Sequence, residues 1–334
     1  MMKLHYHPEE IELAEWDRLV EESPVSTWFQ TPEAYHFYSS LSDIWEPFII
    51  AIDQDHRLKG LIIGTLQKDG GRIKQYFSRR AIILGGPLLD TSITASELSC
   101  LLQGLAKYLA HKAIYLETRN FNDYSTWRDT FEQNGFEYEP HLNFVVSCEN
   151  WEETEQRIGK HRRRYIRQSL REGASIIDNP TVGQVKAYYA LLESLYKTKV
   201  KKPLFPLRFF ENLFHCPSSR FNLIAYNDEI IGGSVCVCLK GRSVYEWFAC
   251  GQDGVYKGIH PSSLTKMAGM RFAHDHGYPL FDMMGAGKPD EKYGVRDFKA
   301  EFGGQLVEYG RFRHVNNALL FNVGKLGIKL LKRI

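Results

Sequence analysis

The sequence lacks an excess of charge of either sign, any long apolar run and any paired-cysteine motif. Its 334 residues contain 42 lysines and arginines and 40 aspartates and glutamates, so the formal net charge is only +2. This balance argues against a surface that is basic throughout, as bulk nucleic-acid binding would require. Apolar runs such as 81–84 are far shorter than the about 20 residues of a membrane-spanning helix. Residues 1–10 lack the apolar core of a signal peptide, and the six cysteines form no C-x-x-C pair, so we expect a cytoplasmic protein.

What is present is the composition of a globular protein with a repeated pattern. Apolar residues make up 43% of the sequence and charged residues 25%, as in soluble folded domains. The same order of elements occurs twice: a β-hairpin, further short strands and then a long amphipathic helix. We expect the hairpins at 47–66 and 221–239, and the long helices at 94–111 and 260–276.

This duplication predicts an α/β (α+β) fold of two tandem domains. Each domain would hold a mixed, mostly antiparallel sheet flanked by helices. We place the first domain at 1–155 and the second at 156–334, with a C-terminal helix at the end of the second.

Positive charge is concentrated between the two halves. The stretch 157–173 carries seven basic residues and one acidic residue, a formal charge of +6, so the rest of the chain is net negative. We expect a basic linking helix that ends at Gly173. It is either a solvated connection or an electrostatic site for phosphates. The candidates for phosphate contacts are Arg162, Arg163, Arg164 and Arg167.

Three short motifs in the second half carry a family resemblance. They are R-x-x-R-x-x-x-R-x-G at 164–173, L-x-x-T-x-x-K at 195–201 and F-K-x-x-F-G-G at 298–304. Together they resemble the Fem family of non-ribosomal peptidyltransferases, and the resemblance extends over essentially the whole chain. The resemblance implies two acetyltransferase-like (GNAT-like) domains and transfer of amino acids from aminoacyl-tRNA to peptidoglycan precursors.

The resemblance assigns the reaction centre to Phe298 and Lys299. The family's Phe-Lys pair engages the acceptor end of the tRNA, so Phe298 would stack on the terminal adenine. An amine that attacks an ester passes through a tetrahedral oxyanion, which the fixed ammonium of Lys299 would stabilise by ~3–4 kcal/mol. The alternative is an exposed helical lysine beside a core phenylalanine. Asp282 and Asp297 are the candidate general bases, unless the amine loses its proton to substrate or solvent.

The resemblance also assigns a substrate cleft. Basic residues of the family grip the precursor's diphosphate, and Lys201 occupies one of their two places. Tyr38 stands at the other place, where the family has a lysine. Tyr245 and Trp247 alternate on one strand and resemble aromatic residues that line the family's cleft, and cross-strand packing is the alternative for both.

An acyl-CoA donor would require a feature that the sequence does not offer. A coenzyme A diphosphate is normally held by a [RQ]-x-x-G-x-[GA] turn before a helix, whose backbone N–H groups face the anion. Gln252 fits the start of such a turn, but Val255 stands where glycine is required. The first half offers only Gly-Gly-Pro at 85–87, where proline removes a donor.

We therefore predict an N-acyltransferase that moves an aminoacyl group from aminoacyl-tRNA to an amine of a peptidoglycan precursor, with no metal and no bound cofactor. It would act as a monomer in the cytoplasm. The segment 318–334, an apolar run interrupted by basic residues, would contact the membrane surface or dock on the core. One alternative is an acyl-CoA-dependent acyltransferase of amino sugars or peptides. The other is a non-catalytic relative that binds RNA or a membrane surface.

Overall fold

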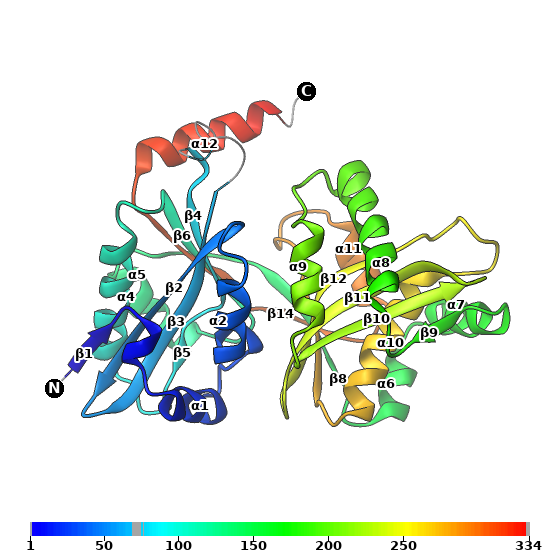
Figure 1. Cartoon of the computed structure of the whole chain (residues 1–334), viewed down its shortest axis with the longest axis horizontal. Helices are drawn as coiled ribbons and strands as arrows, with labels where there is room; N and C mark the ends of the chain where they lie inside the picture. Colours follow the sequence, from blue (N-terminus) through cyan, green and yellow to red (C-terminus); the bar gives the residue numbers. More distant parts are fainter. Residues whose placement is uncertain (1, 69–74, 76, 332–334) are drawn as a thin grey trace. The chain divides into compact units, whose positions relative to one another are not determined.

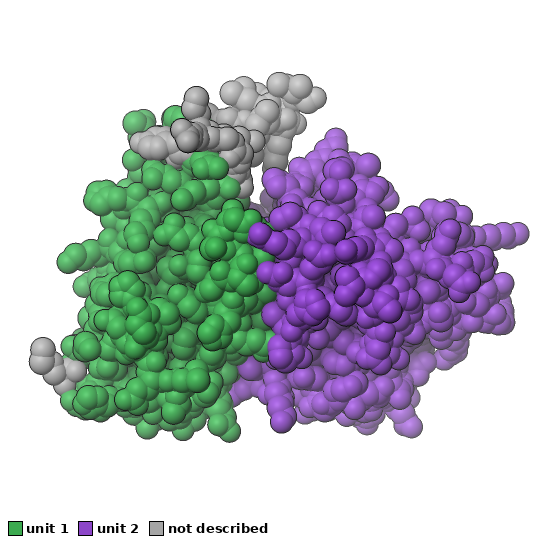
Figure 2. Space-filling model, viewed as in Figure 1, with its two compact units in different colours: residues 1–141, 308–334 green, residues 142–307 purple. Residues whose placement is uncertain are grey.

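The computed structural model contains two compact units, which Figure 2 shows in green and purple. The first unit comprises residues 1–141 and 308–334, and the second comprises residues 142–307. Each unit has a mixed sheet of its own with helices beside it (Figure 1), which confirms the predicted fold class. The described residues are 2–68, 75 and 77–331.

The limits of the units differ from the boundary expected after residue 155. Residues 142–155 belong to the second unit, whose sheet includes β8 (Leu142–Ser147). The C-terminal segment joins the first unit, because β15 (Arg311–Val315) pairs with β6 (Tyr115–Asn120) of that unit's sheet. The linear order of elements does not reveal this return of the chain.

The sheet of the first unit has the strand order β1-β2-β3-β4-β6-β15-β7, with β5 paired to β3. The pair β4 and β6 is parallel, and the other pairs are antiparallel. The antiparallel pair β2 and β3 is the hairpin expected at 47–66. The remaining strands are β1 (Met2–His5), β2 (Trp45–Gln54), β3 (Arg57–Gln67), β4 (Arg80–Gly85), β5 (Leu88–Leu89) and β7 (Glu137–Glu139).

The long helix α4 (Ala95–Leu109) of the first unit buries a stripe of leucines at helical spacing in the core of that unit. Its N-terminus is fixed by a capping box, in which Glu97 accepts the Thr94 N–H at 2.7 Å and donates its own N–H to the Thr94 hydroxyl at 3.3 Å. This confirms the helix expected at 94–111. The other helices of this unit include α1 (Leu13–Glu22), α2 (Pro32–Ser39), α5 (Arg128–Gln133) and α12 (Ala318–Leu331).

The sheet of the second unit has the order β14-β8-β13-β12-β11-β10-β9. The pair β10 and β11 is the hairpin expected at 221–239. The strands are β9 (Ser175–Ile177), β10 (Ser219–Tyr226), β11 (Glu229–Leu239), β12 (Ser243–Gly251), β13 (Leu280–Gly285) and β14 (Gln305–Glu308).

The parallel neighbours β12 and β13 are paired over three residues only. The pairing runs from Ser243 with Leu280 to Tyr245 with Asp282, and both strands continue beyond it. The two strands therefore separate toward their carboxyl ends. The space between them is where the candidate site lies.

The basic stretch 157–173 is interrupted. Helix α6 (Trp151–Arg157) ends, and α7 (Lys160–Arg171) begins after Gly159, whose N–H donates to the Glu301 carbonyl at 2.7 Å. The other helices of the second unit include α8 (Val182–Leu195), α9 (Leu207–Phe214), α10 (Pro261–Asp275) and α11 (Gly294–Ala300).

Over the described part of the chain, every helix is too short or too polar to cross a membrane.

Candidate active site

A cavity of about 440 Å³ opens in the second unit where β12 and β13 separate. Its walls come from the carboxyl ends of these strands, the first turns of α10 and helix α11. We call it the splay pocket. Four of the side chains that line it decide its chemistry, and they are Lys299, Phe298, Glu246 and Lys266.

Lys299 projects from α11 and is 7% exposed. Its ammonium donates to three successive backbone carbonyls of β13: Met283, Gly285 at 2.8 Å and, more weakly, Met284 at 3.3 Å. Removal of the ammonium from water lowers the pKa of Lys299 to about 8, and the negative charge of Asp282 opposes this shift. The site therefore holds a buried cation that is still protonated at neutral pH.

Asp282 belongs to β13 and is buried, but it does not line the pocket. Its carboxylate accepts the Met284 N–H at 2.6 Å, and Met284 has the left-handed φ of 56°. At this point β13 loses its register with β8, between Asp282 and Gly285. The carbonyls that accept hydrogen bonds from Lys299 belong to this irregular segment. Burial raises the pKa of Asp282 to about 7, against the opposing effects of the Met284 N–H and the Lys299 cation.

A second pair of buried charges shares the pocket, and sequence reasoning missed it. Glu246 on β12 is 5% exposed and accepts a hydrogen bond from the ammonium of Lys266 on α10. Burial and the nearby Lys299 cation lower the pKa of Lys266 well below its ordinary value. A single charged residue inside the apolar strand 243–250 is the signal that could have found this pair, because such residues are rarely buried without a partner.

The aromatic residues of the pocket differ in their access to it. Phe298 lines the pocket, and the guanidinium of Arg162 lies 4.5 Å from its ring centroid. Trp247 also lines the pocket and packs edge-on against Phe209, with 5.3 Å between centroids. Tyr245 is buried in the strand and does not reach the pocket, so its position agrees with cross-strand packing.

The arginines of α7 divide into two groups. Arg162 forms two hydrogen bonds of 3.0 Å with the carboxylate of Glu301 and reaches Ser263 at 3.4 Å, so it joins α7 to α11 and α10 and is not free for a phosphate. The opposite face of α7 carries the side chains around a shallow hollow, which we call the α7 patch. These side chains are Lys160, His161, Arg163, Arg164, Arg167, Gln168 and Arg171.

Three other expected site residues lie outside the splay pocket. Lys201 is exposed in a left-handed conformation with a φ of 52°, and its neighbour Lys199 lines the pocket instead. Asp297 is exposed on α11. Tyr38 belongs to the core of the first unit, where it is 2% exposed and packs edge-on against Trp45. The assignment of Tyr38 to a substrate cleft is therefore wrong, because its ring has no access to a ligand.

The backbone at the N-terminus of α10 is already bonded and covered by other groups of this chain. The carboxylate of Asp253 accepts the Ser262 N–H at 3.3 Å. The backbone of Gly251 lies so close that a Cβ there would be 2.6 Å from the Ser262 hydroxyl and 2.7 Å from its nitrogen. An anion at this helix N-terminus would meet a carboxylate in place of free N–H groups.

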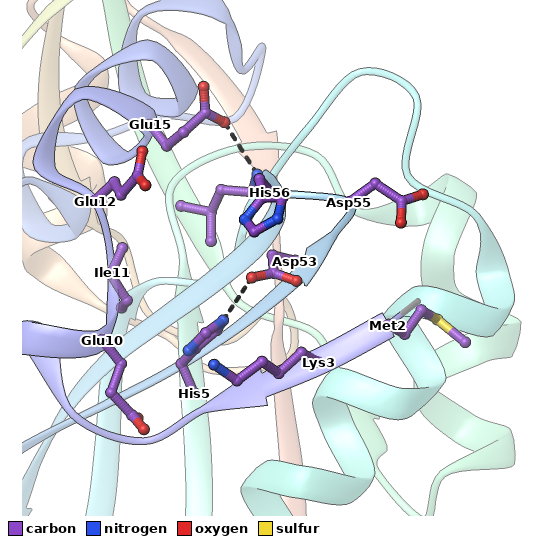
Figure 3. Close-up of a pocket in the computed structure, with 11 residues that line it drawn as sticks. Met2, Lys3, His5, Glu10, Ile11, Glu12, Glu15, Asp53, Asp55 and His56 are labelled. Atoms are coloured by element: carbon purple, nitrogen blue, oxygen red, sulfur yellow. Dashed lines mark hydrogen bonds and ion pairs between the residues drawn. The ribbon is translucent and has the colours of Figure 1, made fainter.

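The first unit has a hollow of about 380 Å³ at its N-terminal strand, shown in Figure 3. Two interactions join groups of this hollow: His5 bonds Asp53 at 2.7 Å, and Glu15 accepts the Leu58 N–H at 3.0 Å.

Comparison with known proteins supports the fold. Residues 159–299 match the model of an acetyltransferase (GNAT) domain. The chain is similar to the crystal structure of FemX, with 13% identity and a TM-score of 0.72, over 96% of this chain and 99% of that one. It is also similar to L-PGS from Bacillus licheniformis, with 12% identity and a TM-score of 0.60, over 96% of both chains.

A tandem GNAT protein from the clavulanic acid biosynthesis pathway has 10% identity and a TM-score of 0.57, over 94% of this chain and 99% of that one. No curated protein matches the sequence significantly. The chain thus has a Fem-like tandem GNAT fold, as the resemblance implies, and its second unit contains the matched domain. The GNAT match supports acyl transfer as the class of reaction.

Proposed function

We propose that the protein transfers an aminoacyl group from aminoacyl-tRNA to an amine of a peptidoglycan precursor. The observation that carries this proposal is the buried ammonium of Lys299 in a pocket beside a basic helix. The cation suits a developing oxyanion, and the helix suits the phosphates of a tRNA acceptor end.

The reaction follows from the groups that face the pocket. The acceptor amine attacks the ester carbonyl carbon, the carbonyl oxygen becomes an oxyanion, and the bond from carbon to the ribose oxygen then breaks. All three protons of Lys299 have carbonyl partners, and the weakest of these bonds, to Met284 at 3.3 Å, is the one that can be exchanged for the oxyanion. Phe298 offers its ring to the terminal adenine.

The surroundings of α10 favour a tRNA donor over acyl-CoA. A CoA diphosphate at the start of α10 would have to displace Asp253 from the Ser262 N–H and would meet its negative charge. The α7 patch, by contrast, carries five lysines and arginines without an acidic residue among its lining side chains. Acyl-CoA transfer to an amino sugar or peptide remains the alternative outcome of the tests, and a non-catalytic RNA-binding or membrane-binding relative is the other.

The donor and acceptor also set where the protein would act. Charged tRNA is cytoplasmic, and a lipid-linked acceptor would bring the protein to the inner membrane face as a peripheral monomer. The C-terminal helix α12 is the candidate contact, although the ring of Phe321 packs 5.4 Å from that of Tyr115 in the first unit, which supports docking of its first turn. Residues 332–334 of the expected membrane segment lie outside the described residues.

The direct test replaces Lys299. Lys299→Met keeps the length of the side chain and removes its charge, so kcat with charged tRNA and a UDP-linked muropeptide should fall about 10²–10³-fold. Lys257→Met, at an exposed position outside the pocket, is the matched control and should keep wild-type turnover. Wild-type turnover in Lys299→Met would remove the assigned role.

A further inference from the structure

We propose that Glu246 is the general base that takes the proton from the attacking amine. This inference rests on the proposed function for the identity of the donor, but the role itself applies to any acyl donor that an amine attacks in the splay pocket. It replaces both general bases expected from the sequence, Asp282 and Asp297.

The two oxygens of Glu246 are in different situations. Oε2 accepts a hydrogen bond from Lys266, whereas the buried Oε1 has no hydrogen-bond partner within the described residues. An unpaired carboxylate oxygen in a buried position is costly, so its persistence indicates a ligand that supplies the missing hydrogen. Because Glu246 lines the splay pocket, this ligand is an N–H group of a bound substrate.

The position of Glu246 on its strand explains how the side chain reaches the pocket. The ladder between β11 and β12 changes register between Val235 and Cys236, so Phe248 faces Val235 and Glu246 faces Cys236. Trp247 is the extra residue of this bulge. Bulges re-aim side chains, and here the irregularity lies beyond the last pairing of β12 with β13, at Tyr245.

The other carboxylates near the pocket are less suited. Asp282 is occupied by a backbone N–H at 2.6 Å and does not line the pocket. Asp297 is exposed and also outside the pocket lining. Asp253 lines the pocket, but it is exposed and caps the first turn of α10. Glu246 is therefore the one buried carboxylate among the described lining residues.

The proton path is balanced without a further reactant. As the amine nitrogen bonds to the carbonyl carbon, one proton passes from that nitrogen to Oε1 of Glu246. When the tetrahedral oxyanion collapses and the bond to the ribose oxygen breaks, the same proton moves from Oε1 to that oxygen. Glu246 ends the cycle as a carboxylate, and an amine that arrives as an ammonium ion first releases one proton to solvent.

Lys266 acts as a positioning residue. The side-chain nitrogen of Lys266 donates to Oε2, which leaves Oε1 as the oxygen of Glu246 without a hydrogen-bond partner among the described residues. A further titratable neighbour is the thiol of Cys236, which pairs with Glu246 from β11, and burial raises the pKa of this thiol to about 12, so it is neutral.

The test compares Glu246→Gln with wild type in steady-state kinetics. Glutamine keeps the size of the side chain and an oxygen for Lys266, but it cannot take a proton. We expect kcat to fall about 10²–10⁴-fold while KM for the acceptor changes less than about threefold. The kcat of the variant should rise about tenfold per pH unit up to about pH 8, above which Lys299 loses its proton, because loss of the amine proton to solvent then limits the rate.

Asp297→Asn is the matched control, because it neutralises an exposed carboxylate that does not line the pocket, and it should keep kcat within about threefold. If Glu246→Gln does not fold, the comparison is made with Glu246→Asp, in which the retracted carboxylate should lower kcat about 10-fold to 100-fold. Wild-type kcat in either variant, or a glutamine variant with the wild-type pH profile, would overturn the proposal.

The same comparison is made with acetyl-CoA as donor and L-lysine as acceptor. Transfer from acetyl-CoA but not from charged tRNA would refute the proposed function and still measure the effect of Glu246. A wild-type protein that transfers from neither donor would refute both.

Discussion

Lys299 is the residue whose charge limits the pH range of the proposed reaction. Its ammonium must be protonated to stabilise an oxyanion, and burial lowers its pKa to about 8. The cation is present below this value and is lost as the pH rises through it. We therefore expect kcat to fall on the alkaline side with a midpoint near this pKa. Rates measured at saturating substrates between about pH 6 and 10 would show this alkaline limb, the fall of kcat. A kcat that stays constant on the alkaline side would contradict the role of Lys299 as the oxyanion-stabilising cation.

Asp282 supports the charge of Lys299, which gives a second prediction. Asp282→Asn keeps an oxygen for the Met284 N–H but removes the negative charge that raises the pKa of Lys299. The alkaline limb should therefore move to lower pH than in wild type. Asp297→Asn, an exposed substitution on α11 two positions from Lys299, is the control and should leave the limb in place. An unchanged limb in Asp282→Asn would show that the two charges are not coupled.

At the scale of elements, the exposed face of α7 is expected to bind phosphates. Replacing Arg163 or Arg167 with alanine should weaken tRNA binding and reduce the slope of log K against log salt by about 0.7–0.9 per residue. Arg271→Ala is the control, because Arg271 lies on α10 and pairs with Asp275 at 2.8 Å. Filter binding of tRNA over a salt series measures the slopes. Equal slopes in all four proteins would exclude α7 as the phosphate contact.

The end of α11 is held against α6 by a glycine. Gly303 has a φ of 73°, and a Cβ there would clash with the Cβ of Arg157 and lie 2.7 Å from its carbonyl oxygen. Gly303→Ala should therefore lower the free energy of unfolding by about 2–4 kcal/mol. At Gly294, the first residue of α11, a Cβ would meet nothing within 4 Å, so Gly294→Ala should be neutral or slightly stabilising. Urea denaturation compares the two variants, and equal stabilities would contradict the account of this junction.

At the scale of the whole molecule, the sequence was sufficient for the tandem α/β organisation, because hairpin and helix periodicities are local. The helices at 95–109 and 261–275 lie within the ranges 94–111 and 260–276 that were expected for the two long helices. The boundary after 155 depended on linear order and could not anticipate that β15 pairs with β6. The motif at 298–304 located Phe298 and Lys299, both of which line the splay pocket.

The rest of the site depends on packing between distant segments. The pair of Glu246 and Lys266 forms only when α10 folds across β12, and neither residue belongs to a motif. Arg162 was assigned to phosphates because its sequence neighbours are basic, but its bond partner, Glu301, is distant in sequence. Tyr38 was assigned through the family's pattern, and its burial follows from the aromatic core around Trp45.

The most direct test of the central claim is a competition between donors. Wild-type protein would receive charged tRNA and acetyl-CoA at equal concentration, with one UDP-linked muropeptide as acceptor, and mass spectrometry would identify the group on the product amine. We predict an aminoacyl group on the product and loss of that product in Lys299→Met. An acetylated product in place of the aminoacylated one would contradict the account.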